Sequence, residues 1–336
     1  MPSQENQERA KRSRRGRKAL IALLVLVAVL VSTVAGFAWW LNRTIDTNVK
    51  RELVLPTQGP VDDAGSPVAV PPGAGVNVLI VGSDARPGES TARSDVIVLA
   101  HLPEDRSAVY LIHLPRDLYV AIPGRGRNKI NASYAFGGAP LLIQTVQNLL
   151  GIKIDHVAKT DFEGFQAMTD AVGGVRVYAE EASNGTGNGG TVVIRQGWND
   201  LNGEQALAFV RERYQLSEGD ISRGRRQMAF IKALMTKAIS KDTLTSPARI
   251  LDLTDAATRN LVVDKGFTTG IMREYAFSLR DVRGRDIVFI TAPFSGFGMD
   301  PTAGSIDIVD EIRMAELGEH IRNDTLDQWS DVTVTP

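Results

Sequence analysis

Residues 76–102 read VNVLIVGSDARPGESTARSDVIVLAHL. Two aliphatic runs, Asn77–Gly82 and Asp95–Leu102, flank a polar segment that contains Pro and Gly, so the stretch predicts two strands joined by a loop. Both runs are almost continuously apolar, which is typical of strands covered on both faces. Four charged residues lie in the loop and at its ends: Asp84, Arg86, Arg93 and Asp95. They could neutralise one another, or they could hold a metal ion and a phosphate together.

The rest of the chain continues the alternation of strands and helices. Further strands are expected at 108–114, 175–178, 191–195 and 286–290, and helices at 140–150, 162–172, 203–213, 220–239, 247–261, 268–282 and 307–321. Asn202 and Asp220 are residues of N-cap type before two of these helices. The glycine-rich segment 181–190 (EASNGTGNGG) is expected to be a mobile loop or hairpin. This alternation favours an α/β fold, a three-layer α-β-α sandwich with a central mixed sheet.

The N-terminal segment predicts one transmembrane helix. Residues 19–41 carry no charge and would extend roughly 34 Å as a helix, enough for the hydrocarbon core of a bilayer. Trp39 and Trp40 occupy an interfacial position, and the basic run RAKRSRRGRK (9–18) precedes the apolar run, which predicts a cytoplasmic N-terminus and an extracytoplasmic domain. A cleaved signal peptide is the alternative, but its apolar region would usually be only about 7–15 residues.

Composition indicates the domain boundaries and excludes several kinds of site and partner. A basic cytoplasmic tail (1–18) and the membrane helix are followed by a stalk rich in Pro and Gly (42–74), a domain at 75–322 and a tail at 323–336. The chain has no cysteine, so disulfides and cysteine zinc sites are absent. A net charge of −1 argues against a nucleic-acid partner.

After other motifs are excluded, the candidate functional residues are mainly arginine and aspartate. GTGNGG lacks the Lys-Ser/Thr ending of a P-loop, and the four histidines show no metal-ligand spacing. Polar and basic residues at strand exits and helix ends include these: Asp84, Arg86, Arg93, Asp95, Arg116, Lys129, Arg211, Arg213, Arg223 and Gln227. Each could form a surface salt bridge worth only ~0–1 kcal/mol. Together they suit a pyrophosphate held on Mg²⁺, because guanidinium groups fit phosphate oxygens and paired carboxylates suit Mg²⁺.

A series of motifs resembles the LytR-CpsA-Psr family over residues 75–240. The series is VLIVGSDAR, RSDVIVLAHL, LIHLPRDLYV, KINASYAFGG, DFEGFQAMTDAVGGV, LNGEQALAFVRER and GDISRGRRQ. The resemblance implies a membrane-bound extracytoplasmic phosphotransferase. Such an enzyme takes a glycopolymer, for example teichoic acid, from a polyprenyl-pyrophosphate carrier and joins it to peptidoglycan through a phosphodiester. It also implies an α-β-α sandwich with an apolar pocket for the prenyl chain.

The resemblance also implies residue roles. Asp84 and Asp95 match the ligands of Mg²⁺ (or Mn²⁺), and with Arg116 they form the expected catalytic set. The expected pyrophosphate-binding residues are Arg86, Arg93, Arg116, Lys129, Arg211, Arg213, Arg223 and Gln227.

Two alternatives fit the same residues. One is a polyprenyl-pyrophosphate hydrolase, in which water replaces the sugar hydroxyl. The other is a non-enzymatic module, anchored in the membrane, that binds polyprenyl phosphates or polyanions. A transcriptional regulator is disfavoured, because the basic residues 9–18 lie beside the membrane segment without a helix-turn-helix around them.

Overall fold

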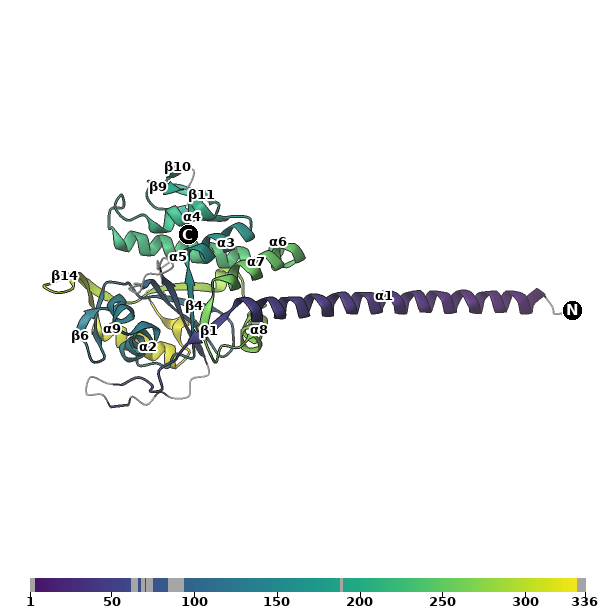
Figure 1. Ribbon diagram of the computed structural model, residues 1–336, viewed down its shortest axis with the longest axis horizontal. Coiled ribbons are helices and arrows are strands. Elements are labelled where there is room, and N and C mark those ends of the chain that lie inside the picture. The colour runs from purple at the N-terminus through teal and green to yellow at the C-terminus, as the bar shows by residue number, and fades with distance from the viewer. Residues whose placement is uncertain are drawn as a thin grey trace. The chain divides into compact units, whose positions relative to one another are not determined.

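A computed structural model describes residues 4–61, 66–67, 70, 75–83, 94–187 and 190–330 (Figure 1). The chain forms two units, residues 1–47 and 48–336. The first is helix α1, Gln4–Asn48, which ends on the first residue of the second unit. Within α1, Leu24–Asn48 is long and apolar enough to cross a membrane, with a mean hydropathy of 2.3. This candidate span overlaps the predicted one at 19–41.

A seven-stranded mixed sheet forms the centre of the second unit. Its strands, in spatial order, are β1 (Lys50–Leu53), β12 (Val262–Asp264), β7 (His156–Asp161), β2 (Val76–Ser83), β3 (Ser94–Leu102), β4 (Val109–His113) and β13 (Ile287–Thr291). β3 is antiparallel to both of its neighbours, whereas β2 and β7 are parallel, as are β4 and β13. The predicted sandwich with a central mixed sheet is confirmed.

The strands are buried on both faces because successive side chains point to opposite sides of the sheet. On β2, Leu79 and Val81 enter one core, which α2 (Ile130–Leu150) and α9 (Glu311–Arg322) cover. Val78 enters a second core on the other face, beneath α5 (Asp220–Ala238) and α8 (Thr269–Ser278). Near-continuous apolar runs are therefore required here, and alternating polar residues would be placed in a core.

A smaller sheet and two ribbons lie beside the central sheet. The smaller sheet has the order β14 (Phe294–Asp300), β15 (Gly304–Val309), β5 (Leu118–Ile122) and β6 (Gly126–Lys129). The ribbons are β9 (Ser183–Gly187) with β10 (Gly190–Ile194), and β8 (Val175–Ala179) with β11 (Gly197–Leu201). The remaining helical segments are α3 (Phe162–Ala171), α4 (Gly203–Arg211), α6 (Lys241–Leu244), α7 (Pro247–Arg259) and the 3-10 turns Gly284–Asp286 and Leu326–Gln328.

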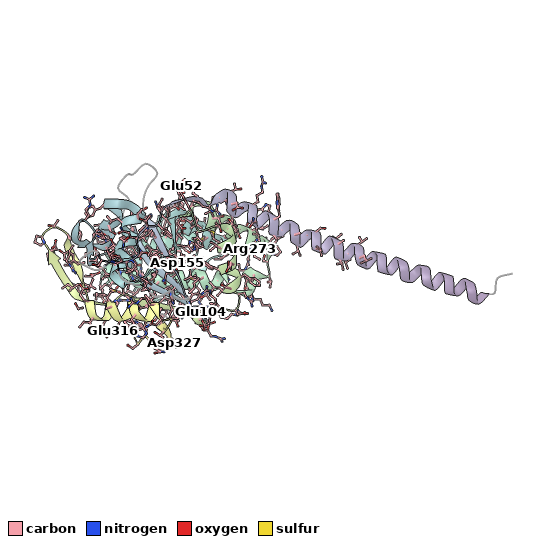
Figure 2. The ribbon with its side chains drawn as sticks, turned by 90° about the horizontal axis from the view of Figure 1, so that it is seen from below. Glu52, Glu104, Asp155, Arg273, Glu316 and Asp327 are labelled. Carbon is pink, nitrogen blue, oxygen red and sulfur yellow. The ribbon has the colours of Figure 1, made fainter. Side chains whose placement is uncertain are left out.

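A third apolar core joins the ribbons to α4 and α5. Phe209 of α4, Phe230 of α5 and Val177 of β8 are all buried in it. In Figure 1 this part lies together above the central sheet, while α2 and α9 lie on its other side. Acidic side chains such as Glu104, Asp155 and Glu316 are spread over the surface of the domain (Figure 2).

Local sequence explains most helix boundaries. Asn202 caps α4 through a capping box with Gln205, as its residue type predicts. The prediction of Asp220 as a cap is wrong by one residue, because Gly219, with φ of 55°, is the N-cap and Asp220 begins α5. The helix predicted from residue 140 begins at Ile130 and is kinked at Gly137 and Gly138. The kink precedes Pro140, whose missing N–H and ring disfavour a continuous helix.

The hairpin alternative for the segment at 181–190 is confirmed, because β9 and the start of β10 pair antiparallel there. Two further predictions differ from the structure. The predicted stalk at 42–74 differs at residues 42–48, which belong to α1, and at residues 50–53, which form strand β1 and pair with β12. The helix predicted at 307–321 begins at Glu311, because residues 304–309 form strand β15.

Candidate active site

Several strand ends that flank the predicted site residues lie at one edge of the central sheet. Ser83, the last residue of β2, lies opposite both Ser94 of β3 and Asp161 of β7. At the same edge, His113 ends β4 beside Thr291, the last residue of β13. Loops that leave these strand ends therefore emerge together, as in other α/β domains where ligands bind at strand exits.

Part of the predicted site falls in the connection between Ser83 and Ser94. Asp84, Arg86 and Arg93 lie outside the described residues, and so does the side chain of Asp95. Among the side chains that are described, no group of three or more His, Asp or Glu could hold a metal ion. The predicted metal ligands Asp84 and Asp95 thus remain a prediction.

The described part of the site is a pocket with about 480 Å³ of empty space. The loop after β4 and the first turns of α5 form most of its wall, and β13, β14 and β15 complete it. Its lining residues are His113, Pro115, Arg116, Asp117, Ile221, Arg223, Gly224, Arg225, Gln227, Thr291, Phe294 and Asp307. Three predicted phosphate-binding residues, Arg116, Arg223 and Gln227, therefore share one pocket.

Asp117 organises the basic side chains at this pocket. Its Oδ1 lies 2.8 Å from Nζ of Lys129, and its Oδ2 lies 3.6 Å from Nε of Arg116. The three side chains are 17–22 % exposed, so their charges are only partly screened by water. The backbone is fixed as well, because Asp307 donates its N–H to the carbonyl of Asp117 at 2.9 Å. This pairing brings Lys129, a fourth predicted residue, to the edge of the pocket.

The N-terminus of α5 adds positive potential. Arg223 and Gln227 are four residues apart and share a helical face, and the helix dipole favours anions at this end. The helix approaches β4 closely at Gly224, where a Cβ atom would lie 2.8 Å from Cε1 of His113. Burial, with a smaller contribution from the charge of Arg223, lowers the pKa of His113 to about 4. His113 is therefore neutral at pH 7 and adds no charge to the pocket.

Two predicted residues lie elsewhere. Arg211 ends α4 and lines a separate hollow with Glu204 and Tyr214. The guanidinium of Arg213 lies 4.5 Å from the centroid of the Tyr214 ring. Nε2 of Gln227 donates to the carbonyl of Val210 at 3.4 Å, so the backbone next to Arg211 is nevertheless tied to the pocket wall.

The profile of the LytR_cpsA_psr family matches residues 56–320. The chain belongs to this family. It is 39% identical over 184 residues to the polyisoprenyl-teichoic acid–peptidoglycan teichoic acid transferase TagU of Oceanobacillus iheyensis, covering 53% of this chain and 56% of the relative. It is 35% identical over 253 residues to the probable cell wall biosynthesis protein LcpB of Corynebacterium glutamicum, covering 71% of this chain and 59% of the relative. The chain thus spans little more than half the length of these relatives.

Solved structures of the family share the fold. The crystal structure of B. subtilis TagV superposes with a TM-score of 0.63 and 25% identity, over 75% of this chain and 97% of TagV. A structure of TagT bound to LIIa-WTA gives a TM-score of 0.59 and 26% identity, over 75% of this chain and 91% of that chain.

The structure adds residues to which the sequence reasoning assigned no role in this LytR-CpsA-Psr site. Asp117 directly follows Arg116, so its position beside a predicted residue was an available signal. His113 lines the pocket, although the four histidines show no metal-ligand spacing in the sequence and His113 was assigned no role. Asp307 is buried and reaches the pocket through the pairing of β15 with β5, which no local pattern indicates.

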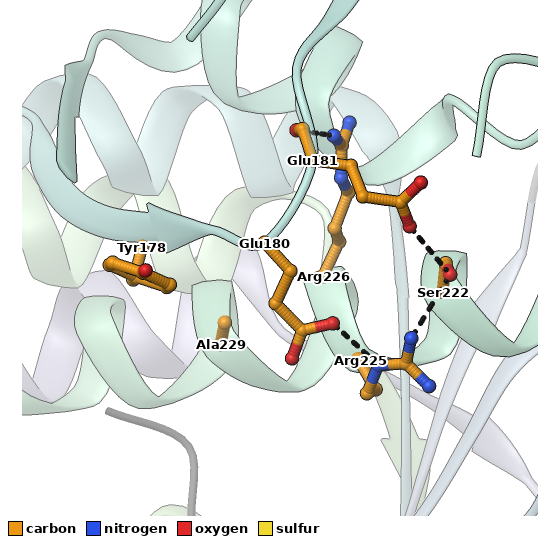
Figure 3. Close-up of a pocket in the computed structure, with 7 residues that line it drawn as sticks. All are labelled: Tyr178, Glu180, Glu181, Ser222, Arg225, Arg226 and Ala229. Carbon is orange, nitrogen blue, oxygen red and sulfur yellow. Dashed lines mark hydrogen bonds and ion pairs between the residues drawn. The ribbon is translucent and has the colours of Figure 1, made fainter. Parts of the chain in front are cut away.

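Not every arginine of the SRGRRQ motif serves the pocket. Arg226 is buried, with its guanidinium 4.8 Å from the Phe209 ring centroid, and it donates to Oγ of Ser183 at 2.8 Å and to the carbonyl of Glu181 at 2.6 Å. Nε of Arg225 pairs with Glu180 at 2.8 Å (Figure 3). Arg226 therefore links the β8–β9 segment to α5 through hydrogen bonds. Arg225 lies at the rim of the pocket.

Proposed function

We propose that this chain is a phosphotransferase that moves a glycopolymer from a polyprenyl-pyrophosphate carrier to a peptidoglycan hydroxyl, forming a phosphodiester. The proposal is supported most directly by the pocket in which Arg116, Arg223 and Gln227 meet at the N-terminus of α5. Guanidinium groups and a helix N-terminus both favour phosphate oxygens. The transferase names of the relatives, and wall teichoic acid in the name of the TagT complex, support the same reaction class.

In this reaction the acceptor hydroxyl attacks the phosphorus nearest the glycan. A new P–O bond forms to the acceptor, the bridging P–O bond breaks, and polyprenyl phosphate leaves with the bridging oxygen. The hydroxyl proton passes to a base, for which the carboxylates of Asp84 and Asp95 are the candidates. Arg116 and Arg223 stabilise negative charge on the transferred and leaving groups, which is where phosphoryl-transfer catalysis resides.

A Mg²⁺ ion, or Mn²⁺ in its place, fits the predicted donors, since Asp84 and Asp95 offer only oxygen ligands. The hydroxyl of Ser94, next to Asp95, is buried and has no hydrogen-bond partner within the described part of the chain. A buried polar group without a partner at this position is consistent with a bound ligand or ion. When bound, the ion would neutralise phosphate charge.

The membrane segment fits a lipid-linked donor. Basic residues 9–18 precede the candidate membrane span Leu24–Asn48, which is the charge order of a cytoplasmic N-terminus with the domain outside. A domain tethered at the outer membrane surface would meet a polyprenyl carrier there.

The test uses the full chain in detergent with a defined prenyl-pyrophosphate glycan, peptidoglycan oligomers and Mg²⁺. Mass spectrometry should detect the phosphodiester product, and Arg116→Ala should abolish it without loss of folded structure. Glycan phosphate formed at equal rate without peptidoglycan would indicate a hydrolase instead. Normal transfer by Arg116→Ala would overturn the proposed site.

A further inference from the structure

A pair of aromatic side chains lies on the outer face of the β8–β11 ribbon. Tyr178 and Trp198 lie directly opposite each other in the antiparallel register. Their ring centroids are 5.5 Å apart and the rings are nearly perpendicular, at 74°. Trp198 is 52% exposed, whereas Val177, which precedes Tyr178 on β8, is buried in the core beneath α5. The fold thus presents a large ring to solvent from a rigid support.

Basic side chains surround this pair in a hollow with about 750 Å³ of empty space. Arg176 comes from β8, whereas Lys232 and Lys237 come from α5. The guanidinium of Arg176 lies 5.4 Å from the Trp198 ring centroid. No carboxylate is found among its described lining residues, which are Arg176, Val177, Tyr178, Trp198, Ala229, Lys232, Ala233, Thr236, Lys237 and Ser240. Across the ribbon, Asp200 lies opposite Arg176 in the register.

We infer that this aromatic–basic hollow binds an anionic segment of a glycan chain. A pyranose ring has an apolar C–H face that packs on an exposed indole, and its hydroxyls remain in water. Phosphate or carboxylate groups on the chain would pair with the three cationic residues. The inference rests on the proposed function, since it assigns a binding surface to the glycopolymer that the pocket at the sheet edge would transfer.

Helix α5 joins this hollow to that pocket. Its first turns carry Arg223 into the pocket, and its last turn carries Lys237 into the hollow, about 21 Å further along the axis. A third hollow lies between them and shares Arg225 with the pocket and Tyr178 and Ala229 with the aromatic–basic hollow. Figure 3 shows Tyr178 at one end of this third hollow and Arg225 at the other.

The acids along this path are already paired. Glu180 binds Arg225, and Glu181 accepts hydrogen bonds from the backbone N–H of Ser217 at 2.8 Å and from Oγ of Ser222 at 3.2 Å. Their charge is therefore partly offset before a ligand arrives. A polymer that leaves the pocket beside Arg225 would reach the aromatic–basic hollow without crossing an unpaired carboxylate of the lining.

An anionic membrane surface is the competing occupant, because lipid headgroups also attract lysine and tryptophan. The concave shape favours the glycan. A flat bilayer would contact protruding residues, whereas here the three cationic residues and the aromatic pair line one hollow.

Binding of trigalacturonate to the full chain in neutral detergent, measured by calorimetry, tests the inference. Trp198→Ala should weaken binding by about tenfold. Lys237→Gln should also weaken it and reduce its dependence on salt. The matched control is Phe277→Ala, because Phe277 is 67% exposed and has Arg280 at 4.6 Å from its ring, outside the hollow. That control should bind as the unmodified chain does.

Three results would overturn the inference. These are unchanged trigalacturonate binding by both hollow variants, equal binding of uncharged maltotriose, and Trp198-dependent binding to phosphatidylglycerol vesicles without binding of trigalacturonate. The Arg116→Ala chain separates this inference from the proposed function. It should bind trigalacturonate normally and fail in transfer, so normal transfer by it would refute the proposed reaction site while leaving the binding result intact.

Discussion

Replacing Asp117 by Asn should slow transfer by roughly 30-fold, equivalent to about 2 kcal/mol of transition-state stabilisation. At 2.8 Å, the attraction between Asp117 and Lys129 is about 6 kcal/mol for an effective dielectric constant of 20. Desolvation offsets most of that attraction, and hydrogen bonds to charged groups contribute a net value of about 1.5–3 kcal/mol. The Arg116 contact at 3.6 Å is weaker and adds little.

The kinetic signature of this variant is specific. Asn keeps the shape of Asp but leaves Lys129 and Arg116 without their shared counter-charge. The pocket then attracts a diphosphate at least as strongly, while the two cations lose their fixed orientation. We therefore expect a lower kcat with an unchanged or lower KM, measured from product formation by mass spectrometry at several donor concentrations.

Asp281→Asn is a matched control for this substitution. Asp281 also follows an arginine, with Nε of Arg280 at 3.5 Å, but the two side chains are 82% and 57% exposed. A screened surface pair of this kind contributes only about 0–1 kcal/mol, so activity should not change. The reasoning fails if Asp117→Asn turns over at the normal kcat, or if its kcat falls only as much as that of the control.

Three other predictions follow from the structure. Arg226→Met should lower the free energy of unfolding by about 2–4 kcal/mol, because it leaves Ser183 and the Glu181 carbonyl without their buried donor; a denaturation curve identical to that of the unmodified chain would contradict this. The unfolded chain binds a proton at His113 near pH 6.5, whereas the folded chain binds it only near pH 4, so stability should fall by about 3 kcal/mol as the pH falls between these values. His113→Gln, if it folds, should flatten that part of the pH profile, and an unaltered slope would refute the assignment. EDTA should stop transfer, Mg²⁺ or Mn²⁺ should restore it, and full turnover in EDTA would exclude the metal from the reaction.

Continuous apolar runs predicted four of the seven central strands, β2, β3, β4 and β13, because burial on both faces demands such runs. Strands without such runs were missed. β1 has the sequence KREL, and its strand conformation depends on pairing with β12, about 210 residues later. β14 (FSGFGMD) alternates half-buried and exposed residues and includes two glycines, so its strand state also depends on its partner β15.

The sequence likewise predicted only some of the residues of the site. Arg116, Arg223 and Gln227 could be predicted because they lie in motifs that resemble a known family, at strand exits and helix ends. Asp307 could not, because it reaches the pocket only when β15 pairs in parallel with β5 in a register that sets it opposite Leu118. The register between distant strands depends on the tertiary fold, so a local sequence pattern does not predict it.

Helical geometry explains why the arginine-rich motif GDISRGRRQ has several roles. Residues four apart share a face, so Arg223 and Gln227 line the pocket together. Arg225 is rotated by about 200° from Arg223, and it pairs with Glu180 and Glu218 at the rim. Arg226 is rotated by about 60° in the other sense, and it is buried against Phe209. Loss of activity after replacing Arg226 would therefore report damage to the support of α5, whereas loss after replacing Arg223 with stability unchanged would report the chemistry of the pocket.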